Sequence, residues 1–486
     1  MAWWWALSLS LVACATTPVQ AARNVDGCPA GKGDTYEVGP RHKLQRLADV
    51  PWTDLGPGDR VLIEWRPEPY REQILLSARG TASQPVRICG VPGPKGQLPV
   101  LTGENAHSAR SLHLPHAATQ ERGIVIISLR DDQRWGEKPK HIVLQSLEIR
   151  GAHPRFQFRT EKSEPRAFRR NAAGVFIERG EHITVRHCTI TDSANGLFVA
   201  SGGSEEVMSR EIVAEGNYVF GNGVAGSYYE HNAYSEAAGI VYQHNRFGPL
   251  RPNAKGNALK DRSAGTVIRY NWIEGGAQLL DLVEPEDSFV LSCADPRFGH
   301  TYVYGNILIN RPEDGPKVVH YGGDNGNEQI YRKGILHFFN NTIIVSGDRL
   351  TRWNTSLFRL ESNGETADVR NNIFFREGST QLFLLMGDGR LRLGSNWISA
   401  GFSPRKEEGL LPIEGANNLI VGQGSPFVDV AHGDLRVRPG SDAARAGGPV
   451  PTDLPAQYRT ERQYIPHQAD APRVQHGGQI WLGAAD

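Results

Sequence analysis

The stretch Thr266-Val-Ile-Arg-Tyr-Asn-Trp-Ile-Glu-Gly-Gly276 decides the fold. Apolar and polar residues alternate up to Asn271, a second apolar pair follows, and two glycines close the segment. This period of two indicates strands, and it does not fit a helix. Asparagine tolerates the left-handed backbone conformation that a sharp corner needs, and its amide can bond nearby backbone groups. The segment therefore predicts a strand, a corner at Asn271 and a second strand.

The same pattern recurs along the chain at gaps of 22 to 35 residues. The asparagines at the corner position are Asn217, Asn245, Asn271, Asn306, Asn341, Asn372, Asn396 and Asn418, and Cys188 takes that position in an earlier copy. A repeat of this size indicates a solenoid, and its variable length favours a parallel β-helix. A β-propeller is the structural alternative, with blades of about 40–50 residues. We predict an all-β parallel β-helix with capped ends, whose corner amides bond one another from rung to rung.

Beyond this pattern, the chain resembles the secreted right-handed parallel β-helix proteins, the superfamily of pectate, alginate and chondroitin lyases. The resemblance covers residues 35–445. Its most specific segment, His231 to Asp287, is similar to a group of bacterial β-helix proteins described as polysaccharide-degrading enzymes. The resemblance implies a right-handed coil, a lysine or arginine as the catalytic base, and Ca²⁺ in many members.

Composition gives no sign of a nucleic-acid or membrane partner. The chain has 53 Lys and Arg residues against 53 Asp and Glu residues, so its formal net charge is zero. No overall field therefore favours a polyanion or an anionic membrane surface. A globular chain of 486 residues would be expected to form several domains. A solenoid can form one long domain instead, because each rung contacts only its neighbours. We expect a monomer.

Residues 1–21 predict an export signal. The run from Met1 to Cys14 is apolar but too short to span a membrane. Small residues at 19–21 fit a signal-peptidase site, which we favour. Leu11-Val-Ala-Cys14 also resembles a bacterial lipobox, which would make Cys14 a lipid-anchored N-terminus. Either route predicts an exported bacterial protein that is periplasmic, extracellular or tethered to the outer membrane.

The remaining chain divides into two parts. We place the coil, with its N-terminal cap, at residues 35–445, and we expect residues 446–486 to pack along it as a tail. The cysteines after the export signal are Cys28, Cys89, Cys188 and Cys293. An even number in an exported protein permits disulfides, but the pairing stays open. We interpret Cys188 as a buried residue of the corner ladder.

Dense polar residues on consecutive rungs mark the candidate site. Core-facing side chains of a β-helix are apolar, so function must lie on an outer face. A basic group, Arg246, Arg251, Lys255, Lys260, Arg262 and Arg269, is followed by an acidic group, Asp281, Glu284, Glu286 and Asp287. Adjacent strands lie about 4.8 Å apart, so a basic strand would neighbour an acidic one. This pattern predicts either a structural ion-pair ladder or a binding site for a uronate-bearing sugar chain.

The residue types suit proton abstraction next to a carboxylate. Removing the C5 proton of a uronate requires that the carboxylate is neutralised and that a base is positioned nearby. Lys260 is the candidate base, with the cation of Arg262 beside it to disfavour its protonated form. Strand alternation puts both on one face, with Asp261 opposite. His231 or Tyr234, one rung away, would return a proton to the leaving oxygen.

The surrounding groups would bind the substrate and a cation. The candidate substrate-binding residues are Arg246, Arg251, Lys255, Arg269, His320 and Arg359, and the candidate Ca²⁺ ligands are Asp281, Glu284 and Asn232. Lys260-Asp-Arg-Ser263 resembles the lysine-bearing strand of alginate and chondroitin lyases. Those enzymes place calcium-binding carboxylates just before the lysine, where this chain has Lys255-Gly-Asn-Ala-Leu.

The predicted function is therefore an exported lyase that cleaves a uronate-containing polysaccharide by β-elimination. A glycoside hydrolase is one alternative, because Asp281, Glu284 and Asp287 could supply the two carboxylates that hydrolysis needs. A uronate C5-epimerase shares the proton abstraction, although the Asp-Pro-His-Asp signature is missing. A non-catalytic carbohydrate-binding or cell-surface protein is the third alternative.

Overall fold

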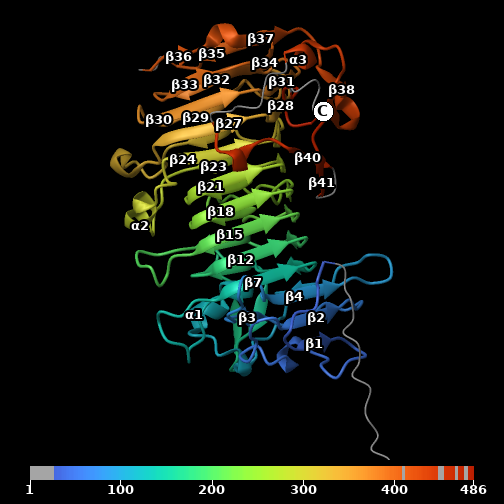
Figure 1. The fold of residues 1–486 in the computed structure, drawn as a ribbon. Coiled ribbons are helices and arrows are strands. Elements are labelled where there is room, and N and C mark those ends of the chain that lie inside the picture. Colours follow the sequence, from blue (N-terminus) through green and yellow to red (C-terminus); the bar gives the residue numbers. More distant parts are fainter. Residues whose placement is uncertain (1–26, 408–410, 447–453, 466–468, 475–479, 486) are drawn as a thin grey trace, which may run out of the picture.

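The computed structural model describes residues 27–407, 411–446, 454–465, 469–474 and 480–485. The predicted export signal, Cys14 included, lies outside them. The described chain winds into a right-handed parallel β-helix, visible in Figure 1 as a column of stacked strands that rises from the blue N-terminal strands to the orange strands β35–β37. The predicted fold class is confirmed.

Three parallel sheets run along the column. Sheet I contains β1 (Thr35–Val38), β2 (Arg60–Glu64), β4 (Val86–Val91), β7 (Lys140–Gln145), β12 (Glu181–Arg186), β15 (Arg210–Glu215), β18 (Ala238–Gln243), β21 (Ala264–Arg269), β24 (His300–Tyr304), β27 (Gly334–Phe339), β30 (Glu365–Arg370), β33 (Arg390–Leu393) and β36 (Ile413–Glu414). Sheet II contains β5 (Val100–Thr102), β8 (Glu148–Arg150), β13 (Thr189–Thr191), β16 (Tyr218–Phe220), β19 (Arg246–Phe247), β22 (Trp272–Glu274), β25 (Ile307–Asn310), β28 (Thr342–Ser346), β31 (Ile373–Glu377), β34 (Asn396–Ser399) and β37 (Leu419–Gly422). Sheet III contains β3 (Ile74–Leu76), β6 (Gly123–Ile127), β11 (Ala173–Glu178), β14 (Asn195–Ala200), β17 (Ala233–Ser235), β20 (Leu259–Asp261), β23 (Gln278–Leu282), β26 (Lys317–Tyr321), β29 (Asn354–Leu360), β32 (Gln381–Gly387) and β35 (Ser403–Arg405).

The other elements are short. Three antiparallel pairs are β9 (Gln157–Arg159) with β10 (Pro165–Ala167), β38 (Phe427–Asp429) with β39 (Asp434–Val437), and β40 (Arg462–Ile465) with β41 (Ala469–Pro472). The helices are α1 (Ala117–Gln120), α2 (Phe289–Ala294) and α3 (Asp442–Arg445), and the 3₁₀ turns are η1 (Leu47–Asp49), η2 (Arg110–Leu112), η3 (Glu328–Ile330), η4 (Ala416–Asn418), η5 (Val430–His432) and η6 (Ala456–Tyr458). None of the helices in the described part of the chain has the length and apolar character to cross a membrane.

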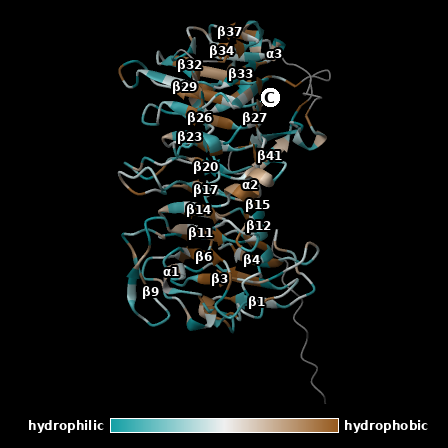
Figure 2. Cartoon of the chain, turned by 90° about the vertical axis from the view of Figure 1, so that its left-hand side faces the viewer, coloured by the Kyte–Doolittle hydropathy of each residue, from teal (hydrophilic) through white to brown (hydrophobic). Residues whose placement is uncertain are grey.

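One rung takes a strand from each sheet in chain order, such as β18, β19 and β20. The inward side chains of successive rungs form one continuous core, in which Ile240, Phe247, Leu259 and Leu280 are fully or almost fully buried. Figure 2 shows these apolar strand segments inside the column, with polar loops outside. Burial of this core stabilises the coil, and the outer face of each sheet remains available for polar chemistry.

A ladder of buried amides lines the corner between sheets I and II. Asn245 Nδ2 donates to Asn271 Oδ1 at 3.0 Å, and Asn271 Nδ2 donates to Asn306 Oδ1 at 2.9 Å. Equivalent bonds join every ladder asparagine from Asn217 to Asn396, which confirms the predicted ladder. Asn418 is exposed, and its amide donates to a carbonyl oxygen of the rung below.

Two further details concern the corner. The left-handed conformation falls on the residue before the asparagine, as at His244 and Tyr270, with φ of 57° and 53°. The expectation that the asparagine itself makes the turn is therefore wrong: its neighbour turns, and its own amide is buried in the ladder. Cys188 does occupy the ladder position, where burial raises the pKa of its thiol to about 12.

Contacts at both ends involve residues far apart in sequence. A disulfide joins Cys28 to Cys89. In the C-terminal tail, the ring of Tyr458 stacks on Tyr302 of sheet I with centroids 3.7 Å apart. The backbone N–H of Ala484 donates to Thr342 Oγ1 of sheet II at 3.0 Å. The described parts of the tail thus lie against sheets I and II, and sheet III stays clear of these contacts.

We predict that Asn271→Ala lowers the free energy of unfolding by about 3 kcal/mol, because it leaves buried donors of Asn245 and the carbonyl oxygen of Tyr242 without partners. Asn418→Ala is the matched control, and it should cost less than about 1 kcal/mol because that amide is exposed. Urea unfolding of both variants measures the difference. Equal losses in the two variants would contradict a stabilising role for the ladder.

Candidate functional site

The site lies on the outer face of sheet III, where side chains of consecutive strands stand in one column. In strand register the column reads Phe198, Tyr234, Lys260, Asp281, His320 and Arg359, on β14, β17, β20, β23, β26 and β29. Aromatic side chains occupy the first two positions and ionisable ones the next four. Since neighbouring strands lie about 4.8 Å apart, each charged side chain is within reach of the next.

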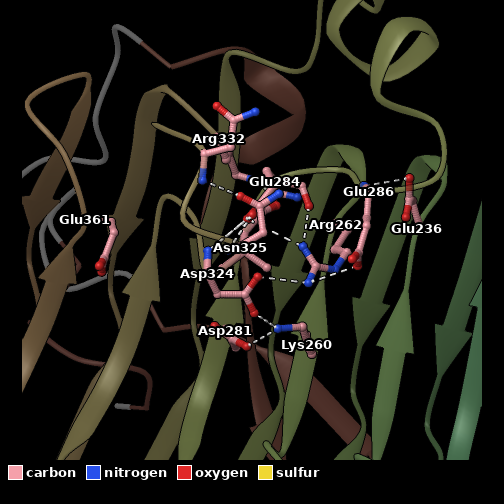
Figure 3. Close-up of polar contacts among 12 residues, drawn as sticks. Glu236, Lys260, Arg262, Asp281, Glu284, Glu286, Asp324, Asn325, Arg332 and Glu361 are labelled. Atoms are coloured by element: carbon pink, nitrogen blue, oxygen red, sulfur yellow. Dashed lines mark hydrogen bonds and ion pairs between the residues drawn. The ribbon is translucent and has the colours of Figure 1, made fainter. Parts of the chain in front are cut away.

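Lys260 and Arg262 point at one carboxylate. Figure 3 shows both cations converging on Asp324, which lies in the loop after β26. Arg262 Nη2 is 2.9 Å from Asp324 Oδ1, and Lys260 Nζ contacts Asp324 Oδ2. Only 7% of Lys260 and 5% of Arg262 are exposed, whereas Asp324 is exposed. The two buried cations thus form a carboxylate-binding pair, with a loop side chain bound to it.

Arg262 is held in place by Glu284 and Tyr234. Its Nη1 donates to the backbone oxygen of Glu284 at 2.7 Å, and its Nε donates to Tyr234 Oη at 3.0 Å. The carboxylate of Glu284 accepts the backbone N–H groups of Asp324 and Asn325. Burial and the nearby charge of Asp324 raise the pKa of Glu284. These contacts fix the guanidinium and the start of the loop relative to each other.

A second chain of contacts runs from Lys260 across three rungs. Lys260 Nζ is 2.8 Å from Asp281 Oδ2, and His320 Nδ1 is 2.7 Å from Asp281 Oδ1. On the other side of its ring, His320 Nε2 is 3.1 Å from Glu361 Oε2, which Arg359 also contacts. The two carboxylates outweigh burial and raise the pKa of His320. Their cationic partners lower the pKa of Asp281, and they lower that of Glu361 to about 2.

A fully buried ion pair supports the site from the core side. Asp261 lies on the opposite face of β20 from Lys260, as predicted, and accepts hydrogen bonds from Ser235 and Thr266. Arg332 Nη2 binds Asp261 Oδ2 at 3.0 Å and Ser263 O at 2.7 Å. Because Arg332 ends the loop that carries Asp324, this pair anchors the loop to the core.

His231 and Tyr234 lie beside the cations, and each keeps an N–H or O–H group there. Burial, then the charge of Lys260, lowers the pKa of His231 to about 3, so its ring is neutral. Its Nδ1 accepts the backbone N–H of Asn257 at 2.8 Å, which leaves the proton on Nε2. Burial raises the pKa of Tyr234, so its hydroxyl keeps its proton.

The structure does not gather all of the predicted substrate-binding residues. His320 and Arg359 belong to the column. Arg246 lies on sheet II, where it pairs with Glu274, and Arg269 ends β21 of sheet I, where it binds Gln243. Arg251 pairs with Asp192, and Lys255 lies over the ring of Tyr228. The expectation that all six basic residues share one face is therefore wrong, because the basic stretch continues through several corners of the coil.

The predicted calcium ligands do not fit a calcium site. Both oxygens of Asp281 are bound by Lys260, His320 and Asn257, and Glu284 accepts two backbone N–H groups. The side chain of Asn232 is buried between Asn222 and Gly248. Ca²⁺ needs six to eight oxygen ligands. Here Lys260 already neutralises Asp281, and Arg262 already neutralises Glu284. Among the described residues, the one group with metal-ligand spacing is the exposed set His113, Asp131 and Asp132, which lies outside this column.

Two residues of this cluster had no assigned role in the sequence prediction. Asp324 follows β26 after two glycines, and Glu361 directly follows β29. The available signal was an acid shortly after an apolar strand that carries a basic residue. Their contacts could not be derived from it, because the paths of the loops set them.

Comparisons with known proteins concern the fold. No family model matches the chain, and no curated protein matches its sequence. Similar solved structures include pectate lyase Pel9A, with a TM-score of 0.45 and 10% identity over 88% of this chain and 94% of that one. A rhamnogalacturonan lyase has a TM-score of 0.41 and 8% identity, over 82% of this chain and 92% of that one. An alginate lyase from Paenibacillus sp. str. FPU-7 has a TM-score of 0.37 and 13% identity, over 76% of this chain and 94% of that one.

We predict that His320→Gln lowers the free energy of unfolding by about 3 kcal/mol at pH 6, because it leaves the buried carboxylate of Asp281 and the partly buried one of Glu361 without their shared cation. Since the folded pKa of His320 is raised, its stabilising contribution is complete below its unfolded value, about 6.5, and is lost as pH rises through the folded value. Urea unfolding at pH 6 and pH 9 should therefore show a gap between parent and variant that shrinks at pH 9. A gap of constant size would contradict the charged bridge.

Proposed function

We propose that the protein is an exported lyase that cleaves a uronate-containing polysaccharide by β-elimination. The observation that carries this proposal is the Asp324 carboxylate held between Lys260 and Arg262. The carboxylate of a uronate presents the same pair of oxygens, so it can take this position when Asp324 withdraws. Because the exchange replaces one carboxylate with another, the two buried cations stay paired throughout.

Glycines flank the loop position that carries Asp324. Gly322 has a φ of 135° and Gly326 a φ of 82°, both in the region that favours glycine. The backbone N–H of Asp324 is bound by Glu284 and Arg332 at the end of the loop is fully buried, whereas Asp324 itself is exposed. Rotation of the Asp324 side chain therefore releases the carboxylate without movement of the loop.

The residues then divide the work of elimination. Arg262 neutralises the substrate carboxylate, which makes the C5 proton more acidic. Lys260, in its neutral form, takes that proton. The electron pair forms the C4=C5 double bond as the bond from C4 to the leaving oxygen breaks. Tyr234, whose raised pKa keeps it protonated, donates a proton to that oxygen, and the Nε2–H of His231 lies on the same side.

Other features support export and the class of substrate. The apolar segment 1–21 suits a secretion signal, and the disulfide between Cys28 and Cys89 suits an oxidising compartment. The resemblance of His231 to Asp287 to bacterial polysaccharide-degrading proteins agrees with a sugar chain as the partner.

We predict that the mature protein releases unsaturated products from at least one of polygalacturonate, alginate, hyaluronan and chondroitin sulfate, detected by the ultraviolet absorbance of the C4=C5 bond. Lys260→Ala and Arg262→Ala should each reduce the rate about a hundredfold or more. Lys43→Ala is the matched control, since that lysine is exposed and lies between β1 and β2, outside the column, and it should keep nearly the parental rate. EDTA should leave the rate unchanged.

Three results would count against the proposal. New reducing ends without ultraviolet absorbance would indicate a hydrolase. If none of the polysaccharides gives either ultraviolet absorbance or new reducing ends, the degradative function is refuted. A folded Lys260→Ala variant with near-parental activity would show that another group is the base.

A further inference from the structure

A pocket of about 660 Å³ lies on the same face of sheet III, towards the N-terminal end of the column. Its floor is formed by β11 and the end of β14, and its walls by the segment around α1 and the loop 128–135. Asp287 also lines it, from the loop whose Glu286 contacts Arg262. The pocket is therefore a neighbour of the carboxylate-binding pair, although no step of the proposed reaction uses it.

Arg122 places an unpaired positive charge in this pocket. Its guanidinium lies over the rings of Phe176 and Phe198, 4.3 Å and 5.3 Å from their centroids. Among the residues that the structure describes, the guanidinium makes no hydrogen bond or ion pair, and its Nε is buried without a partner. Two acids, Glu178 and Asp287, act on it only at longer range. Because a partly buried cation without a bonded anion is costly, this arrangement suits an anionic ligand.

Trp135 provides a flat apolar surface beside this charge. The indole lines the pocket and is 61% exposed, which is unusual for so large an apolar side chain. The guanidinium of Arg179 lies 4.3 Å from its ring centroid and supports it from one side. Arg179 is itself buried, and its Nη1 has no hydrogen-bond partner in the described structure. Arg179 also pairs with Glu178 at 3.9 Å, so among the described residues the arginine of this pocket without a bonded partner is Arg122. An exposed, supported ring in the same pocket as this charge suits a molecule that is apolar on one face and charged at its edge.

A line of aromatic rings connects the pocket to the reaction site. The Phe176 and Phe198 centroids are 5.6 Å apart, and the Phe198 and Tyr234 centroids are 4.7 Å apart. Tyr234 stands next to Lys260 in register. Two to three rungs, about 10–14 Å along the coil, therefore separate the Arg122 guanidinium from Lys260. One sugar chain lying along sheet III can reach both places.

We propose that this pocket is a second subsite for an acidic sugar unit, in which Arg122 binds the carboxylate or sulfate group and Trp135 stacks on the sugar ring. This second proposal rests on the proposed function because it takes an acidic polysaccharide as the ligand. It does not depend on the reaction that the protein catalyses. The substrate then lies parallel to the axis of the coil and is held by charges at both ends: Arg122 at one and the Lys260–Arg262 pair at the other.

Binding in a Lys260→Ala background, which prevents turnover, tests the subsite. Isothermal titration calorimetry would measure the affinities of hexasaccharides of galacturonate, mannuronate, hyaluronan and chondroitin sulfate, with cellohexaose as the neutral probe. We expect at least one acidic hexasaccharide to bind and cellohexaose not to bind. Arg122→Met and Trp135→Ala should each weaken binding about tenfold. Arg134→Ala, an exposed arginine outside the pocket, is the matched control and should leave the affinity unchanged.

Arg122→Lys keeps the charge and guards against a folding defect in Arg122→Met, and it should bind more tightly than the methionine variant. Equal affinities for Arg122→Met and Arg134→Ala, equal binding of cellohexaose, or no binding of any acidic hexasaccharide would overturn the subsite. The outcomes are separable from those of the proposed function. Loss of affinity in Arg122→Met without any unsaturated product from the parent would refute the lyase and keep the subsite. Unsaturated product from the parent, together with unchanged affinity in Arg122→Met, would keep the lyase and refute the subsite.

Discussion

The buried amide ladder fixes the geometry on which the rest of the structure depends. The Oδ1 of each ladder asparagine from Asn245 to Asn396 accepts both the amide and the backbone N–H of the asparagine before it, so these rungs must repeat the same corner at the same height. Loops elsewhere can then vary in length without shifting the strands. Residues separated by more than a hundred positions, from Tyr234 to Arg359, consequently stand in one straight column on sheet III.

Within that column, burial makes charge balance the governing constraint. Lys260, Arg262, Asp281 and His320 are each at least nine-tenths buried, and each is bound to an opposite charge. Removing a single partner would leave a buried charge uncompensated, which is costly. Asp324 is the exposed member, and in the proposed function it is the one that a substrate carboxylate replaces. On that proposal, stability and carboxylate recognition come from the same contacts.

The sequence predicted features that repeat or alternate, and it missed those that loops create. The asparagine spacing predicted the coil, and strand alternation placed Lys260 and Asp261 on opposite faces. The sheet to which a residue belongs was harder to predict, because variable loops obscure where each strand begins, and so Arg246 and Arg269 were assigned to the wrong face. Asp324 and Arg332 reach the site only through the path of the loop after β26, which no local pattern encodes.

The central claim is that Asp324 occupies the place of a substrate carboxylate. A crystal structure of the Lys260→Ala variant with a bound acidic oligosaccharide tests it most directly. The account predicts a sugar carboxylate at Arg262, in the position that Asp324 now takes, with the Asp324 side chain turned away and Arg332 unmoved. A sugar bound elsewhere, with Asp324 still on Arg262, would contradict it.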